Sequence, residues 1–128
     1  MSIPAALNVS PEMFEQEANM KKTNERLTHN SRKKVDILLS FGANQDLNSS
    51  LNKLIIFQIA KYRSHINQID YELKNFEAKY KMSSEEFFDK FQSGVLDDAA
   101  DYFEWAGLYE NVLLYKERIQ SLETVLNK

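Results

Sequence analysis

The stretch IIFQIAKYRSHINQIDYELKNFEAKY, residues 55–80, decides the fold of this chain. Its large apolar side chains recur at alternating steps of four and three residues, which is the spacing of a heptad repeat. This spacing places them on one stripe of a helix, and a second helix must cover that stripe. The stripe consists of Ile55, Ile59, Tyr62, Ile66, Ile69, Leu73, Phe76 and Tyr80.

A second stripe of the same kind lies near the end of the chain. Helices over 51–80 and 99–126 would each be about 42–45 Å long, at about 1.5 Å per residue. Two stripes of matched length in one chain predict an antiparallel hairpin of long helices in coiled-coil-like packing. The second stripe consists of Trp105, Leu108, Val112, Tyr115, Ile119, Leu122 and Leu126.

Residues 81–98 predict a short helix between the two long ones. Ser83 and Glu86 have the spacing of a capping box, in which each side chain accepts a hydrogen bond from the other residue's backbone N–H. Gly94 suits the left-handed position that ends a helix. The apolar side chains of this short helix are Phe87, Phe88 and Phe91.

Acidic residues mark the start of the second long helix. Asp97 or Asp98 is expected to cap it, and Asp101 should lie in or near its first turn, where the helix dipole favours negative charge. Strand-type alternation never occurs, and both prolines lie near the start of the chain. The predicted fold class is therefore all-α.

Residues 1–50 carry a weaker pattern. Ser10, Pro11 and Glu12 suit a helix start, but the residues up to Lys34 are mostly polar. The segment VDILLSF is apolar again, and GANQDLNSS, residues 42–50, is typical of a turn. We expect one or two helices here, forming an N-terminal helical arm (1–50) that is flexible or dimerises, followed by the hairpin domain (51–128). The apolar side chains available for dimerisation are Met13, Phe14, Val35, Leu38 and Leu39.

Composition excludes several classes of protein. Sixteen basic and 19 acidic residues nearly balance, so no strong nucleic-acid field dominates the chain, and the absence of cysteine excludes disulfides and thiolate metal sites. The N-terminus lacks the basic and apolar regions of a signal peptide. The longest apolar run, LIIF at 54–57, is far shorter than the roughly 20 residues of a membrane helix. We expect a soluble, cytoplasmic protein with no membrane contact.

No residue pattern supports enzyme chemistry. Asp97, Asp101 and Glu104 would share a helix face that could suit a hard cation, but the spacing of an EF-hand loop fails when it is counted from Asp97. Neither His29 nor His65 follows a glutamate at the spacing of a helical di-metal site. Nucleophilic triads and glycine-rich phosphate loops are absent as well. We predict a protein that is not an enzyme and has no cofactor or metal.

A basic stretch within residues 21–34 is the candidate for nucleic-acid binding. The sequence after it is weakly similar to a helix-turn-helix with Gly42 in the turn, although Asn48 would occupy a position that is normally apolar. A solvated charged face is the favoured explanation of the stretch. The candidate residues are Lys21, Lys22, Arg26, Arg32, Lys33 and Lys34.

Aromatic side chains gather at the start of the second long helix. On a helix at about 100° per residue, the apolar side chains of 102–109 cover an arc of roughly 220°, and one facing helix covers about half of that. A small core at the closed end of the hairpin explains most of this excess. The remainder indicates contact with another protein, because aromatic residues with charged neighbours are typical of binding hot spots. The candidate partner-binding residues are Tyr102, Phe103, Trp105, Tyr109 and Phe88.

The stretch FEAKYKMSSEEFFDKFQSGVLDDAADYFEWAGLYE resembles a family of small bacterial and archaeal helical proteins. Their pattern is K-Y-G-M-S-x-E-E-F, then F, then G-x-L-x-D-x-x-D-x-F-E-W, and this chain has Lys81 in place of its first glycine. The resemblance covers about residues 70–120. Some members look like the antitoxin half of a two-gene module, which implies a non-catalytic protein that binds and neutralises its neighbour. Matching residues are Lys79, Tyr80, Met82, Ser83, Glu85, Glu86, Phe87, Phe91, Gly94, Leu96, Asp98, Asp101, Phe103, Glu104 and Trp105.

Three functions remain open on the sequence. The first is a protein-binding module, antitoxin-like, that neutralises a partner protein such as a toxin-like neighbour. The second is a DNA-binding regulator that uses the basic 21–34 stretch. The third is a self-associating structural coiled coil. In each case we expect a homo-oligomer, with a dimer favoured.

Overall fold

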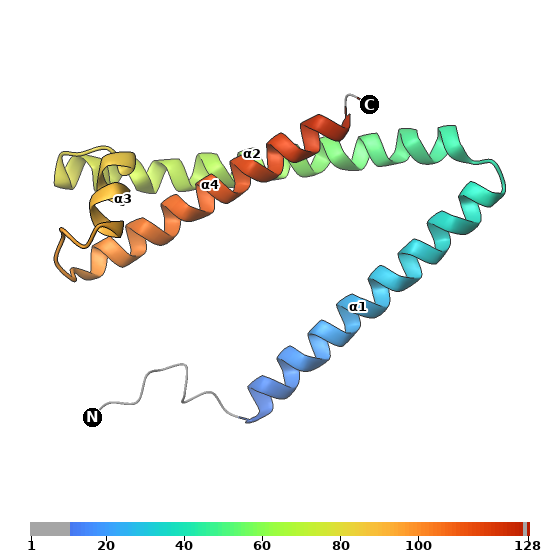
Figure 1. Cartoon of the computed structure of the whole chain (residues 1–128), viewed down its shortest axis with the longest axis horizontal. Helices are drawn as coiled ribbons and strands as arrows, with labels where there is room; N and C mark the ends of the chain where they lie inside the picture. The colour runs from blue at the N-terminus through green and yellow to red at the C-terminus, as the bar shows by residue number, and fades with distance from the viewer. Residues whose placement is uncertain (1–10, 127) are drawn as a thin grey trace. The chain divides into compact units, whose positions relative to one another are not determined.

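The computed structural model describes residues 11–126 and 128. It contains α1 (Pro11–Ser40), α2 (Asn44–Tyr80), α3 (Ser84–Gln92) and α4 (Ala100–Leu126), and no strand lies within the described residues (Figure 1). The all-α fold class is confirmed. The described residues divide into two compact units, with the boundary between Ser49 and Ser50.

The N-terminal unit is built on one continuous helix. Among the residues of α1, Val35 alone is half-buried and the others are exposed. Glu12 lies in the first turn, where it complements the helix dipole. Ser10, the expected cap, lies outside the described residues.

Helix α1 ends in a Schellman motif. Gly42 has φ +83°, and its N–H donates to the Leu39 carbonyl at 3.1 Å, while the Ala43 N–H donates to the Leu38 carbonyl at 3.0 Å. These two bonds satisfy carbonyls that the helix end would otherwise leave unpaired. Gly42 is well suited to this position because a side chain there would meet the strain of the left-handed region.

The prediction of a turn over 42–50 is wrong, because the Schellman motif completes the turn by residue 43. The Ala43 carbonyl already accepts from the Leu47 N–H at 2.9 Å, so α2 begins at Asn44. Asparagine and serine weaken a helix only modestly, and residues 44–50 contain no glycine or proline. Helix α2 is therefore 37 residues long, longer than predicted.

Helices α2 and α4 form the predicted antiparallel hairpin. All 15 residues of the two stripes are buried or half-buried. Toward the open end, the rings of Tyr62 and Tyr115 stack with centroids 5.4 Å apart, and Arg63 pairs with Glu123 at 2.6 Å. The heptad prediction is confirmed along the full length of both stripes.

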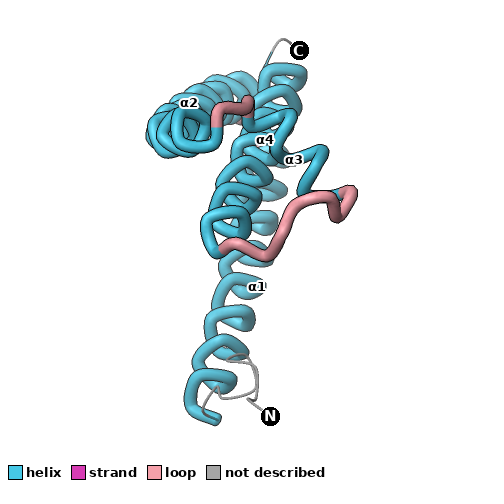
Figure 2. Tube along the Cα trace, turned by 90° about the vertical axis from the view of Figure 1, so that its left-hand side faces the viewer, coloured by secondary structure: helices cyan, strands magenta, loops and turns pink. Residues whose placement is uncertain are grey.

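Helix α3 closes one end of the hairpin and lies beside α4, between two loops (Figure 2). Ser83 caps it by accepting a hydrogen bond from the Glu86 N–H at 3.1 Å, which is one half of the predicted capping box. The Glu86 carboxylate lies 3.2 Å from Lys90 Nζ on the next turn. A second Schellman motif ends the helix at Gly94, φ +75°, as predicted.

Helix α4 begins at Ala100, so the prediction of Asp97 or Asp98 as its cap is wrong. Ala99 precedes the helix, and its carbonyl accepts from the Tyr102 N–H at 3.0 Å. Leu96 packs against the core, and both aspartates follow it in the loop with their side chains exposed. Asp101 does lie in the first turn, as predicted.

Candidate interaction site at the closed end of the hairpin

The closed end of the hairpin is organised around Trp105, whose side chain is fully buried. Its ring stacks on Phe87 of α3, with centroids 3.8 Å apart and an interplanar angle of 3°. Phe76 and Tyr80 of α2 stack on the same indole at 5.6 and 5.7 Å. Trp105 therefore joins α2, α3 and α4 and belongs to the core.

Two hydrogen bonds that meet at Ser84 accompany this aromatic core. Trp105 Nε1–H donates to Ser84 Oγ at 2.9 Å, and the Ser84 N–H donates to Glu77 Oε2 at 2.8 Å. A buried indole N–H without an acceptor would cost free energy, and Ser84 removes that cost. Within the described residues, no buried side-chain nitrogen or oxygen lacks a partner.

A second polar cluster joins the end of α2 to the start of α4. Asp101 Oδ2 accepts from Lys79 Nζ at 2.7 Å and from the Tyr80 hydroxyl at 2.6 Å. The Lys79 and Tyr80 hydrogen bonds hold the pKa of Asp101 below its ordinary value. The same carboxylate raises the pKa of Lys79 and that of Tyr80, in each case first through its hydrogen bond.

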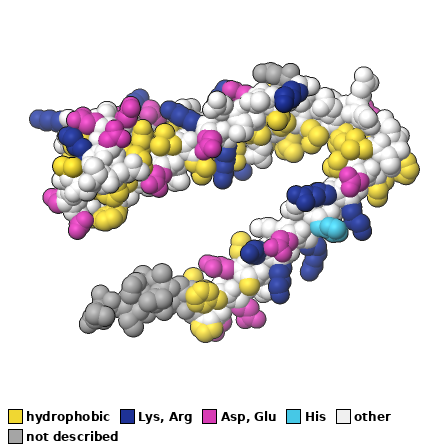
Figure 3. All heavy atoms as spheres, in the orientation of Figure 1, with side chains coloured by type: hydrophobic (Ala, Val, Ile, Leu, Met, Phe, Trp, Pro, Cys, Tyr) yellow, Lys and Arg dark blue, Asp and Glu magenta, His cyan; other side chains and the backbone are white. Residues whose placement is uncertain are grey.

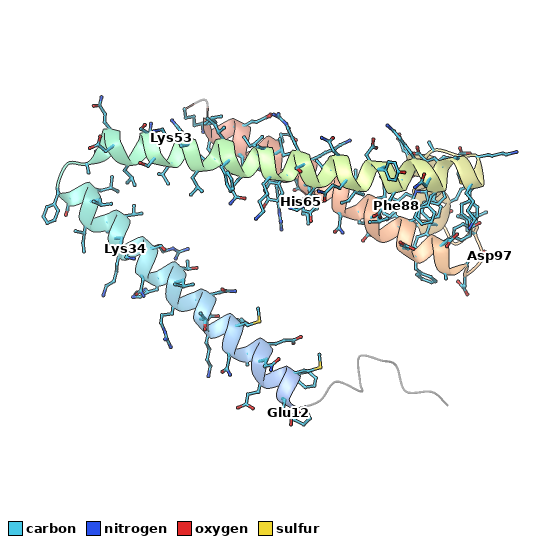
Figure 4. The ribbon with its side chains drawn as sticks, turned by 180° about the vertical axis from the view of Figure 1, so that it is seen from behind. Glu12, Lys34, Lys53, His65, Phe88 and Asp97 are labelled. Carbon is cyan, nitrogen blue, oxygen red and sulfur yellow. The ribbon has the colours of Figure 1, made fainter. Side chains whose placement is uncertain are left out.

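Three other candidate residues also lie in or against the core. Phe88 is buried and meets Tyr109 edge to face at 5.1 Å, within the crowded aromatic side chains of Figure 4. Tyr102 is half-buried and contacts Phe87 at 5.5 Å. Burial raises the pKa of Tyr109, and the charges of nearby carboxylates on α3 raise it further.

Phe103 is the candidate residue that remains open to a partner, with 59 % of its surface exposed. It lies on α4 and meets the half-buried ring of Phe91 on α3 edge to face, with centroids 5.6 Å apart. We call these two rings the outer aromatic pair. Val95, in the loop after α3, is 72 % exposed.

Acidic residues dominate the segment that carries the outer aromatic pair. Residues 83–110 contain eight carboxylates and a single basic residue, Lys90. Seven of the eight are exposed and Asp101 is half-buried. Magenta carboxylates accordingly gather at this end of the hairpin beside yellow apolar atoms (Figure 3). The arrangement can bind a basic surface that carries an apolar side chain.

Two features of the closed end were missed in the sequence. The first is the hydrogen bond from Trp105 to Ser84. A buried tryptophan needs a hydrogen-bond acceptor, and Ser84 is a hydroxyl residue in the first turn of the Phe-rich helix. Lys81 is the second, with φ +55° at the end of α2. Glycine adopts positive φ without strain, whereas lysine does not.

The six basic candidates all lie on α1, and all are exposed, as is Lys34 in Figure 4. At about 100° per residue, five of them fall within an arc of about 140° and Lys34 lies outside it.

Within the described residues no group of three or more His, Asp or Glu side chains is placed to hold a metal ion. No helix there combines the length and apolar character needed to cross a membrane.

Comparisons of the chain with protein-family models, with curated proteins and with solved structures find no match.

Proposed function

We propose that the protein is a cytoplasmic, non-catalytic protein-binding module, antitoxin-like, that neutralises a partner protein through the closed end of its hairpin. The observation that carries the proposal is Phe103, a large aromatic side chain that is 59 % exposed, whereas Tyr102, Trp105 and Ala106 on the same helix lie in or against the core. Exposed aromatic rings surrounded by charged groups are typical of binding hot spots. The excess of carboxylates around it favours a partner with a basic surface.

The test compares two exposed side chains of α4 in capture experiments from the native host. Phe103→Ala should abolish retention of a stoichiometric partner, whereas Leu114→Ala, which truncates a side chain 40 % exposed on the same helix, should retain it. Circular dichroism of both variants should remain unchanged, because neither residue belongs to the buried core. Equal retention by both variants would remove Phe103 from the proposal.

DNA binding through α1 is the second candidate. Lys22, Arg26 and Lys33 fall within about 40° of one another around the helix and are all exposed, so they can contact one phosphate backbone together. Replacing all three with Ala should reduce retention on duplex DNA at low salt and flatten its salt dependence. The matched control replaces three exposed lysines of the hairpin, Lys53, Lys61 and Lys116, and should leave retention unchanged. DNA affinity that is the same in both triple variants would exclude this function for α1.

A further inference from the structure

Helix α1 carries a third heptad stripe. Seven positions follow one another at alternating steps of three and four residues, as on α2 and α4. All seven side chains are exposed in the structure. They are Glu17, Met20, Asn24, Leu27, Ser31, Lys34 and Leu38.

The apolar members of this stripe leave much of their surface in water. Met20, Leu27 and Leu38 are 66 %, 59 % and 44 % exposed, and no residue of α1 is fully buried. They lie within about 20° of one another around the helix, so a single partner helix can cover all three.

The charges on the stripe select one partner and one orientation. In the part of the stripe from Glu17 to Lys34, three pairs of positions are symmetric about the midpoint between residues 25 and 26: Glu17 with Lys34, Met20 with Ser31, and Asn24 with Leu27. When a second copy of α1 is laid antiparallel on the first, Glu17 faces the partner's Lys34 at both ends. Each bulky apolar side chain near the middle then faces a smaller or polar one. A parallel pair would place Glu17 against Glu17 and Lys34 against Lys34, which is repulsive.

We propose that α1 is the interface of an antiparallel homodimer, with the stripe from Glu17 to Lys34 paired to itself about a two-fold axis. A two-fold interface must be self-complementary, and this distribution of charge and size meets that requirement. Lys22, Arg26 and Lys33 lie on the opposite side of the helix and stay accessible in the dimer. The proposal involves α1 alone, so it stands or falls independently of partner binding at the closed end of the hairpin.

Charge reversal tests the pairing, with molar mass measured by sedimentation over a hundredfold range of protein concentration. Glu17→Lys and Lys34→Glu should each raise the dimer dissociation constant at least tenfold, because each creates two like-charged contacts. The double variant exchanges the two charges and should recover most of the wild-type affinity. Lys22→Glu, the matched control, makes the same reversal about 160° away from the stripe and should leave the dissociation constant within about twofold. Circular dichroism shows whether each variant keeps its helix content.

A distance measurement tests the orientation. The chain has no cysteine, so Gln16→Cys, which lies beside the stripe, provides a single site for a spin label. In the antiparallel dimer the two labels are about 29 Å apart along the axis, at about 1.5 Å per residue. In a parallel pair they are about 10 Å apart, the distance between packed helix axes.

Three results would overturn the proposal. One is a monomer at every concentration tested. The second is a dimer that both single charge reversals leave intact, which would place the interface elsewhere. The third is a short label distance, which would establish parallel pairing.

Discussion

The hairpin and α1 use the same heptad spacing and reach opposite outcomes. On α2 and α4 every stripe position is a large apolar residue, and all of them are buried or half-buried within the chain. On α1 three apolar stripe residues are mixed with the polar or charged Glu17, Asn24, Ser31 and Lys34, and all seven are exposed. The difference teaches that the spacing determines which face of a helix can pack against another helix. The residue types on that face determine how stable the packing is and which helix can serve as the partner. A stripe made only of apolar residues packs against another helix of the same chain. A stripe with few apolar residues and with charges can instead select its partner through those charges.

The largest contrast is expected between Trp105→Ala and Leu27→Ala. Removing the fully buried indole should lower the free energy of unfolding of the hairpin by about 3–5 kcal/mol, because it leaves a cavity among three helices. Leu27→Ala on the exposed stripe should change it by less than about 0.5 kcal/mol. Urea denaturation followed by circular dichroism measures both values at protein concentrations where α1 is monomeric. Similar losses would mean that α1 contributes to the same cooperative unit as the hairpin.

Ser84→Ala tests how much the buried hydrogen bond from Trp105 contributes to the stability of the hairpin core. It removes the acceptor of the Trp105 Nε1–H bond without changing the aromatic packing, so stability should fall by about 1–3 kcal/mol. The Ser84 N–H bond to Glu77 remains, because a backbone group makes it. Ser93→Ala is the control, since its exposed hydroxyl bonds only to the Lys90 carbonyl one turn earlier. Equal effects of the two changes would contradict a special role for the buried hydroxyl.

Lys81→Gly should stabilise the hairpin by about 1 kcal/mol. Lys81 has φ +55°, a conformation that costs an ordinary residue about 1–2 kcal/mol and glycine very little. Part of the gain is offset because glycine has more freedom in the unfolded chain. A rise in the urea midpoint with an unchanged slope confirms the effect, and a fall would show that the Lys81 side chain makes a contact worth more than the strain.

The Asp101 cluster adds a smaller effect that depends on pH. Because the folded pKa of Asp101 lies below the ordinary 3.8, its contribution is fully present above that value and is lost as the pH falls further. Lys79 and Tyr80 have raised pKa values, so their contribution is present below about pH 10 and is lost above it. Asp101→Asn should therefore flatten the stability profile at both ends. A profile identical to wild type below pH 4 would mean that other carboxylates dominate acid unfolding.

The stripes of α2 and α4 could be predicted because the alternating three- and four-residue spacing of their apolar residues is visible in the sequence itself. The start of α2 at Asn44 was not predicted, because the polar residues after Gly42 are typical of a turn, whereas the Schellman bonds at Gly42 and Ala43 complete the turn before these residues are reached. At the closed end the heptad already placed Trp105 in the seam, which was a better guide to its burial than its aromatic character. Which ring stays outside depends on where α3 lies over α4, and that position follows from contacts such as Phe87 on Trp105 rather than from any local pattern.

The position of α3 also sets an order of events in folding. The bonds at the closed end join residues about 20 apart in the chain, such as Trp105 with Ser84, whereas Arg63 and Glu123 near the open end are 60 residues apart. Closing a short loop costs less entropy, so the hairpin should nucleate at α3 and zip toward its open end. Conservative substitutions around Phe87 should then slow folding, and those around Ile59 should mainly speed unfolding, which stopped-flow kinetics can separate. The contacts of the short helix α3 would therefore form first and fix the register in which α2 and α4 pack.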